Sequence, residues 1–382
     1  MCESVPSDEA PRARGTGDHM GRFRLLSIDG GGIRGYIPAL VLEELEHRLG
    51  SPLYRHFDVI AGTSAGGILA LSLATSRREP RARELVDRWR TTAPTVFPRT
   101  LFDKAFTRLR KTVPLVDSAL GVLGLPTDVE PQDAFNPKYP PYGRAKVLKQ
   151  YFGDEPLSAA RTRVFVTAYE TEIRTPVFFV SRDEDRSEDD YHLASSQGIS
   201  MFDAAMATSA APTYFPAHLV FRGPGKRSLS LVDGGVFANN PTDLAHAFLR
   251  RDTSYEGDVV VSLGTGGMER SYPYHRIKSW GAAQWGLPAI KMMLDGQTEA
   301  TALGMRRRLA HAHYYRFQES LDGDPYDPTD DVADEIDDIS DRNFDRMERL
   351  ARRIIRHRDR DLDRLCAELT KAPATRDAGQ VV

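Results

Sequence analysis

The chain has 382 residues, of which 41% are hydrophobic and 27% charged, and its 51 Lys and Arg nearly balance its 54 Asp and Glu, for a formal net charge of −3. This composition excludes a disordered chain, which combines low hydrophobicity with high net charge, and it argues against binding to a nucleic acid polymer, which needs a basic field. The length fits one large α/β domain with insertions, or two smaller domains. The two cysteines, Cys2 and Cys366, form no CxxC pair, so we expect neither a disulfide framework nor a cysteine zinc site, and a reducing cytoplasm fits.

The N-terminal part of the chain predicts two successive strand–turn–helix units. Residues 1–21 hold acids and prolines without an apolar core, so we expect a disordered leader and not a secretory signal. Apolar runs at 24–29 and 57–61 predict buried strands, and each is followed by a glycine-rich turn and a helix, at 36–49 and 68–74 respectively. This order is typical of a parallel sheet with helical crossovers.

The longest apolar stretch, residues 59–75, is slightly too short for a membrane span and contains glycines and a serine that would pack poorly against lipid. We therefore expect it to be buried within the protein. Residues 77–160 are less regular, with helices predicted at 84–90 and 145–152, and we expect them to form a lid or cap insertion. Within this insertion, 100–125 carries basic residues and then an apolar run, which predicts either a membrane contact or a lid packed on the protein's own core.

The rest of the chain alternates strands and helices and then becomes mainly helical. Two β-rich runs, 163–169 and 177–181, predict neighbouring strands. We expect residues 271–382 to pack as a mainly helical part on the same domain, interrupted by an acidic loop. The other predicted elements are a helix at 201–211, a strand at 229–232, a helix at 242–251 and a last buried strand at 258–263.

The pattern G-x-S-x-G at 62–66 lies between a predicted strand and a predicted helix. A nucleophilic serine needs such a strained turn, because small neighbours such as Gly62 and Gly66 let the backbone bend and expose the hydroxyl. The N-terminus of the following helix also favours developing negative charge. Ser64 is therefore a candidate nucleophile; the alternative is a tight crossover turn with a solvated serine.

A second glycine-rich turn, DGGGIRG at 29–35, also joins a strand to a helix, and its backbone N–H groups can form an anion site. A dinucleotide-binding site would require an acidic residue at the end of a second strand about 20 residues further on. Here the acidic residues fall on a surface helix, so an oxyanion hole serving Ser64 is favoured. Arg34 either adds positive charge to this turn, faces solvent or braces the loop.

Asp233 ends a predicted strand and is followed by two glycines. This pattern is either a plain turn or a carboxylate that takes the serine proton. Every histidine after Ser64 is interpreted as structural or exposed, since none follows a buried strand in a glycine-rich turn. We therefore favour a Ser–Asp dyad without histidine. The histidines concerned are His192, His218, His246, His275, His311, His313 and His357.

Five strings in this order resemble the patatin-like phospholipases and acyl hydrolases. They are DGGGIRG at 29–35, GTSAG at 62–66, ATSAAPTYFP at 207–216, DGGVFANNP at 233–241 and VSLGTG at 261–266. The resemblance covers residues 23–267 and implies a three-layer α/β/α fold around a central, mostly parallel sheet, with the catalytic domain at 22–270.

The resemblance also implies a chemistry. Fatty acyl esters of phospholipids or galactolipids would be hydrolysed without a metal by Ser64 as nucleophile and Asp233 as base. The backbone of Gly30, Gly31 and Gly32, with Arg34 adjoining, would form the oxyanion hole.

The layout and the string YYRFQ at 314–318 are also similar to stand-alone bacterial members of that family. Some of these are antiphage effectors that a cyclic dinucleotide activates to degrade the host membrane. This likeness implies a cytoplasmic enzyme that binds the membrane transiently when active, and it leaves the oligomeric state open. The alternatives are an acyl hydrolase of general lipid turnover, a catalytically silent scaffold and a Rossmann-like dinucleotide-binding protein.

Overall fold

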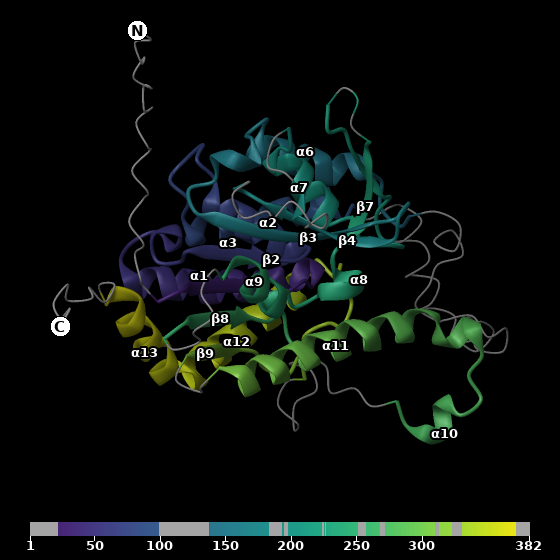
Figure 1. Cartoon of the computed structure of the whole chain (residues 1–382). Coiled ribbons are helices and arrows are strands. Elements are labelled where there is room, and N and C mark those ends of the chain that lie inside the picture. The colour runs from purple at the N-terminus through teal and green to yellow at the C-terminus, as the bar shows by residue number, and fades with distance from the viewer. Residues whose placement is uncertain are drawn as a thin grey trace, which may run out of the picture.

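The computed structural model contains one mixed, mostly parallel sheet with helices on both faces (Figure 1). It describes residues 22–98, 137–182, 193–194, 198–223, 225, 227–250, 257–267, 272–309, 313–322 and 331–371. The three-layer α/β/α fold with a central, mostly parallel sheet is thus confirmed. Residues 1–21 and the candidate membrane contact at 100–125 lie outside the described residues.

Within the part of the chain that the structure describes, the sheet has nine strands. Along its main path the order is β5-β4-β3-β2-β1-β8-β9, and β7 also pairs with β3 and with β6. Pairing is parallel for β1–β2, β1–β8, β2–β3, β8–β9 and β4–β5, and antiparallel for β3–β4, β3–β7 and β6–β7. The strands are β1 Arg24–Ile28, β2 Val59–Gly62, β3 Arg163–Glu170, β4 Thr175–Val180, β5 Leu193–Ala194, β6 His218–Val220, β7 Leu229–Asp233, β8 Val259–Leu263 and β9 Tyr314–Phe317.

Helices follow most strands and cover the two faces of the sheet (Figure 1). The α-helices are α1 Tyr36–Leu49, α2 Ala65–Ala74, α3 Ala82–Val96, α6 Pro141–Phe152, α7 Met201–Thr208, α8 Gly235–Ala238, α9 Thr242–Leu249, α10 Tyr274–Ile277, α11 Ala282–Arg308, α12 Asp341–His357 and α13 Asp359–Thr370. Short 3-10 helices are η1 Gly32–Gly35, η2 Leu53–Arg55 and η4 Leu157–Ala159.

Alternating side chains of the central strands form two hydrophobic cores. In β1, Leu26 and Ile28 join the larger core with α1, α2 and α12, while Leu25 joins the smaller core with α9 and α11. In β3 the same alternation divides Val164 from Phe165. Successive strand residues point to opposite faces, so a run that is apolar throughout is buried on both sides.

The edge of β3 aligns two strand ends that are distant in the sequence. β2 runs parallel to β3 and ends with Gly62 opposite Val166, whereas β7 runs antiparallel to β3 and ends with Asp233 opposite Ala168. The two strands therefore approach one another head-on, and a single β3 residue, Thr167, separates their ends. Their following turns meet at that point.

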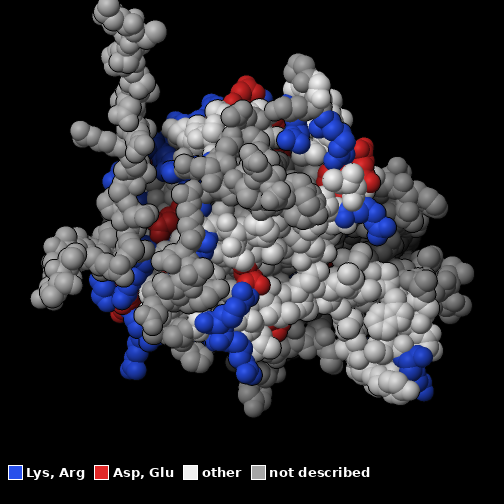
Figure 2. Space-filling model, viewed as in Figure 1, with Lys and Arg blue, Asp and Glu red and all other residues white. Residues whose placement is uncertain are grey.

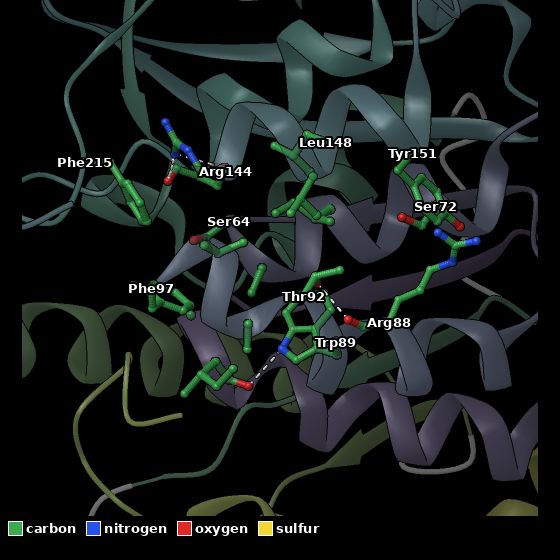
Figure 3. A pocket seen from close by; sticks show the side chains of 18 of the residues that line it. Ser64, Ser72, Arg88, Trp89, Thr92, Phe97, Arg144, Leu148, Tyr151 and Phe215 are labelled. Carbon is green, nitrogen blue, oxygen red and sulfur yellow. Dashed lines mark hydrogen bonds between the residues drawn. The ribbon is translucent and has the colours of Figure 1, made fainter. Parts of the chain in front are cut away.

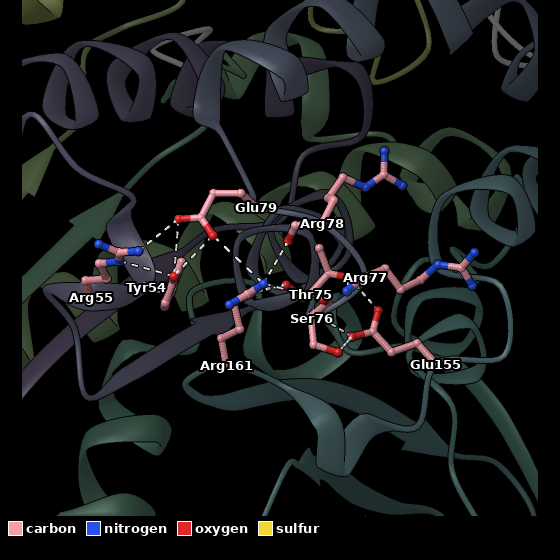
Figure 4. Close-up of polar contacts among 9 residues, drawn as sticks. All are labelled: Tyr54, Arg55, Thr75, Ser76, Arg77, Arg78, Glu79, Glu155 and Arg161. Carbon is pink, nitrogen blue, oxygen red and sulfur yellow. Dashed lines mark hydrogen bonds and ion pairs between the residues drawn. The ribbon is translucent and has the colours of Figure 1, made fainter.

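A polar cluster holds the far end of α2 (Figure 4). The buried Glu155 carboxylate accepts hydrogen bonds from the Ser76 N–H at 2.6 Å, the Ser76 hydroxyl at 2.7 Å and the Thr75 hydroxyl. Arg161 donates from its backbone N–H to the Ala74 carbonyl at 2.8 Å and from Nε to the Thr75 carbonyl at 3.1 Å. These donors satisfy carbonyls that a helix C-terminus leaves unpaired.

The predicted elements are confirmed in type, with shifts at their ends. The helix predicted at 68–74 begins at Ala65, and the one predicted at 145–152 begins at Pro141, because proline is tolerated at the first helical position. The prediction that 258–263 was the last strand is wrong, since β9 adds a parallel edge strand. Within the described residues, no helix combines the length and the apolar character that a membrane span requires.

Candidate active site

Ser64 occupies a strained turn between β2 and α2. Its backbone has φ 55° and ψ −122°, in a region that L-residues rarely adopt, and its N–H donates to the Thr208 hydroxyl at 2.8 Å. The flanking glycines are required by close approach. A Cβ on Gly62 would lie 2.1 Å from the Gly66 carbonyl oxygen, and one on Gly66 would lie 2.2 Å from the Ile28 carbonyl oxygen. The turn has the form that exposes a nucleophile at a helix N-terminus.

Asp233 ends β7 and is 4% exposed. Its backbone N–H donates to the Ala210 carbonyl at 3.0 Å, and its Oδ1 accepts from the Gly235 N–H at 2.8 Å. Burial raises the pKa of its carboxyl to about 6, against the lowering effects of hydrogen bonding with the Ser64 hydroxyl and of the Arg144 cation. A carboxylate with such a pKa is mostly ionised at neutral pH and can accept a proton.

The first glycine-rich turn lies directly beside Ser64, because a Cβ on Gly30 would be 3.3 Å from the Ser64 Cβ. The Gly30 N–H donates to the Asn239 carbonyl at 3.0 Å and is therefore engaged. The N–H groups of Gly31 and Gly32 donate to no acceptor within the described ranges. Of the three donors predicted for the oxyanion hole, two are free to receive an oxyanion.

Contacts from the C-terminal side of the sheet fix this turn. Arg316 of β9 binds the buried Asp29 carboxylate with both terminal nitrogens, at 3.1 and 2.6 Å, and also donates to the Ser262 hydroxyl at 2.8 Å. The Thr265 hydroxyl donates to the Gly30 carbonyl at 2.7 Å. A bidentate arginine–carboxylate pair adds geometric specificity, so the turn has one defined position.

Arg34 lies in the same turn, and its guanidinium is buried. Burial lowers its pKa, while the neighbouring carboxylates of Asp334 and Asp295 act to raise it. Its Nε and Nη1 atoms are buried and have no hydrogen-bond partner in the part of the chain that the structure describes. The prediction that Arg34 faces solvent is therefore excluded, and the alternatives that it adds positive charge to the turn or braces the loop remain.

An apolar pocket of about 150 Å³, partly open to solvent, is lined in part by Ser64. Figure 3 shows Ser64, Arg144 and Phe215 toward one end and Ser72, Arg88 and Tyr151 toward the other. Trp89 forms part of its wall and donates from Nε1 to the Ile33 carbonyl at 3.0 Å. Its other large apolar lining residues are Ile33, Ile68, Leu85, Val96, Phe97, Val147, Leu148, Phe152, Tyr214 and Ile336.

Arg144 is a cation that acts on Asp233 and that the sequence analysis did not indicate. It lies on α6, is 2% exposed, stacks over the Phe215 ring at 4.4 Å and donates from Nη1 to the Ser209 carbonyl. Burial lowers its pKa to about 10, which the negative charge of Asp233 partly opposes. Ser209 precedes Ala210, whose carbonyl receives the Asp233 N–H, so Arg144 is linked to Asp233 through two adjacent residues.

Other sequence candidates lie away from this site. His246 is buried on α9 with its Nε2 2.9 Å from an Asp258 oxygen, as expected of a structural histidine. His218 lies 3.3 Å from Asp203, and His357 lies 3.2 Å from Glu319. Among the described residues, no group of three or more His, Cys, Asp or Glu side chains is arranged to hold a metal ion.

Comparison of the sequence with known proteins consistently identifies patatin-like proteins. Residues 26–246 match the family model described as patatin-like phospholipase. Patatin-like protein 2 of Arabidopsis thaliana is 31% identical over 341 residues, which cover 78% of this chain and 76% of that protein. Patatin group D-2 of Solanum tuberosum is 30% identical over 303 residues, covering 71% and 68%. The alignment with the crystal structure of VipD from Legionella pneumophila covers 87% of this chain and 67% of the VipD chain, with a TM-score of 0.36 and 12% sequence identity. This similarity is too low to support any inference.

Proposed function

The chain belongs to the patatin-like phospholipase family of serine lipid acyl hydrolases, and from this premise we propose that it hydrolyses phospholipid acyl esters with Ser64 as nucleophile and Asp233 as base. One observation carries the proposal: a strained serine that lines an apolar pocket is hydrogen-bonded to a buried carboxylate with a pKa of about 6. The pocket suits a fatty acyl chain, because its walls offer apolar surface to replace water.

The reaction has two steps. Asp233 accepts the hydroxyl proton while Ser64 Oγ forms a bond to the ester carbonyl carbon, and the N–H groups of Gly31 and Gly32 stabilise the resulting oxyanion. The tetrahedral intermediate collapses, the alcohol of the lysolipid leaves with the proton, and an acyl-enzyme remains. Water then attacks the carbonyl carbon of the acyl-enzyme and gives a proton to Asp233. The bond from that carbon to Ser64 Oγ breaks, Asp233 returns the proton to Ser64 Oγ, and the fatty acid leaves.

The decisive experiment measures fatty-acid release from phosphatidylcholine–phosphatidylglycerol vesicles by wild type, Ser64→Ala, Asp233→Asn and Ser72→Ala. Ser72 lines the same pocket but lies within α2, away from the turn, and is therefore the matched control. We expect release by wild type and Ser72→Ala, and none above background by the other two. A fluorophosphonate probe should label wild type and not Ser64→Ala. Equal release by all four proteins would refute the dyad, and absent labelling of wild type would indicate a silent scaffold or a dinucleotide-binding protein.

The same assay tests activation by a cyclic dinucleotide, which rests on the likeness to stand-alone bacterial members. If wild type releases fatty acid only after one member of a panel of cyclic dinucleotides is added, a nucleotide-activated effector is supported. Full release without nucleotide, unchanged by the panel, favours general lipid turnover.

A further inference from the structure

The residues between β8 and the middle of α11 have an unusual composition. No Asp or Glu occurs from 271 to 294, although the chain contains 54 acidic residues. The same range holds two of the three tryptophans of the chain, Trp280 and Trp285, and the cations Arg276, Lys278 and Lys291. We call residues 272–294, which comprise α10 and the first half of α11, the interfacial arm.

The interfacial arm projects from the body of the molecule (Figure 1) and exposes apolar side chains. Tyr274 is 79% exposed, Met293 60%, Ile290 46% and Met292 45%. Figure 2 shows the projecting part as a largely uncharged surface with basic side chains at its outer end. Large exposed apolar side chains concentrated in one short projecting segment mark a site of interaction.

Aromatic rings stiffen the junction between α10 and α11. Trp280 packs edge-to-face against Trp285 at 5.2 Å between ring centroids, and Tyr272 packs edge-to-face against Trp280 at 5.8 Å. All three side chains are half-buried, so each keeps part of its ring accessible. Tyrosine and tryptophan are enriched where protein meets the polar–apolar boundary of a bilayer.

The inner part of α11 contacts the candidate active site. Lys291 pairs with Asp334 at 2.6 Å, and two residues further on Ile336 lines the pocket. Gln297 donates from Nε2 to the carbonyl of Val236, close to Asp233 in the chain, at 3.2 Å. The arm therefore extends outward from the edge of the pocket, so a surface that binds the arm lies near the pocket.

We propose that the interfacial arm binds the surface of an anionic lipid bilayer and thereby holds the pocket at its substrate, an inference that rests on the proposed function. The charges identify the occupant. Arg276 and Lys278 are exposed and form no ion pair with any described residue, and no carboxylate of the arm itself repels lipid phosphate. Basic residues near a bilayer gain from its negative surface potential, while exposed apolar and aromatic side chains gain from burial among the lipids.

The test separates binding from catalysis. Binding is measured by co-sedimentation with phosphatidylcholine vesicles containing 30% phosphatidylglycerol, in the Ser64→Ala background so that lipids stay intact. Neutralising both cations, Arg276→Gln with Lys278→Gln, should weaken partitioning about 30-fold. Met293→Asp should weaken it about ten-fold or more. Both sets, placed in active protein, should retain hydrolysis of a water-soluble short-chain ester.

Matched controls lie elsewhere on the surface. Ile173→Asp, at a position 58% exposed between β3 and β4, and Arg356→Gln with Arg360→Gln, at the α12–α13 junction, should leave vesicle binding unchanged. Equal binding by arm and control variants overturns the proposal. The proposal is also overturned if wild type is a dimer in size-exclusion chromatography and Met293→Asp converts it to a monomer, because the interfacial arm would then bind a second copy of the chain. Vesicle binding that depends on the arm without any ester hydrolysis would refute the proposed function alone.

Discussion

Replacing Asp233 by asparagine should stabilise the fold while abolishing activity, and the gain should increase with pH. Burial raises the pKa of this carboxyl to about 6 from its ordinary 3.8. The folded state thus binds the proton more tightly than the unfolded state. The contribution of protonated Asp233 to the free energy of unfolding is fully present below pH 3.8 and is lost as the pH rises through 6.

The size of the effect follows from these two pKa values. At pH 8 the ionised Asp233 costs about 3 kcal/mol of unfolding free energy relative to its protonated form, and at pH 5 it costs about 1.5 kcal/mol. Asparagine does not titrate. The free energy of unfolding of Asp233→Asn minus that of wild type should therefore increase by about 1.5 kcal/mol between pH 5 and pH 8, whatever constant offset the new amide introduces.

Urea unfolding monitored by tryptophan fluorescence at several pH values measures this difference. Asp258→Asn is the control with the opposite sign. Ion pairing with His246 and Arg250 lowers the pKa of Asp258 despite its burial, so its substitution should destabilise the protein at neutral pH. A difference between Asp233→Asn and wild type that stays constant from pH 5 to pH 8 would refute the reasoning, because Asp233 would then have an ordinary pKa in the folded state.

Two further predictions concern residues that support the dyad. Arg144→Met removes a cation that lowers the pKa of Asp233, so the acid limb of the pH profile of kcat/KM toward a soluble ester should move to higher pH than in wild type. Arg144→Lys keeps the positive charge and should return the acid limb to its wild-type position. An acid limb that does not move in Arg144→Met contradicts an electrostatic role for Arg144. Thr208→Val removes the hydroxyl that accepts the Ser64 N–H and should lower the free energy of unfolding by about 1–3 kcal/mol. Thr208→Ser, the control, keeps that hydroxyl and should lower it less. Equal losses in the two variants would show that the hydroxyl does not stabilise the turn.

The features of the fold and of the candidate site that could be predicted from the sequence are those set by residues close together in the chain. The turns at Ser64 and Asp233 are indicated because a strand, a glycine-rich turn and a helix follow one another within a few residues. Continuous apolar runs indicate β1, β2 and β8, since a parallel strand that is buried on both faces is apolar throughout.

What could not be predicted depends on contacts between distant segments. Arg316 carries no local signal for binding Asp29, although the aromatic residues of Tyr314–Phe317 could have indicated the strand β9 that carries it. Arg144 lies in the first turn of α6, an ordinary amphipathic helix, and its burial beside Phe215 depends on the packing of α6 against α3 and α7. The engagement of the Gly30 N–H likewise depends on Asn239, which follows α8.

The head-on meeting of β2 and β7 along β3 has a consequence for how the protein can change. The separation between the two turns depends on one residue of β3, Thr167, whose hydroxyl lies 2.7 Å from that of Thr63. The length of residues 77–160, which the sequence predicts as a lid or cap insertion, does not enter that separation, so this segment can vary in length without moving Ser64 and Asp233 apart. Deleting one residue within β3 would instead turn its later side chains to the opposite face. Diversity of substrate can therefore arise in residues 77–160 while Ser64 and Asp233 keep their positions.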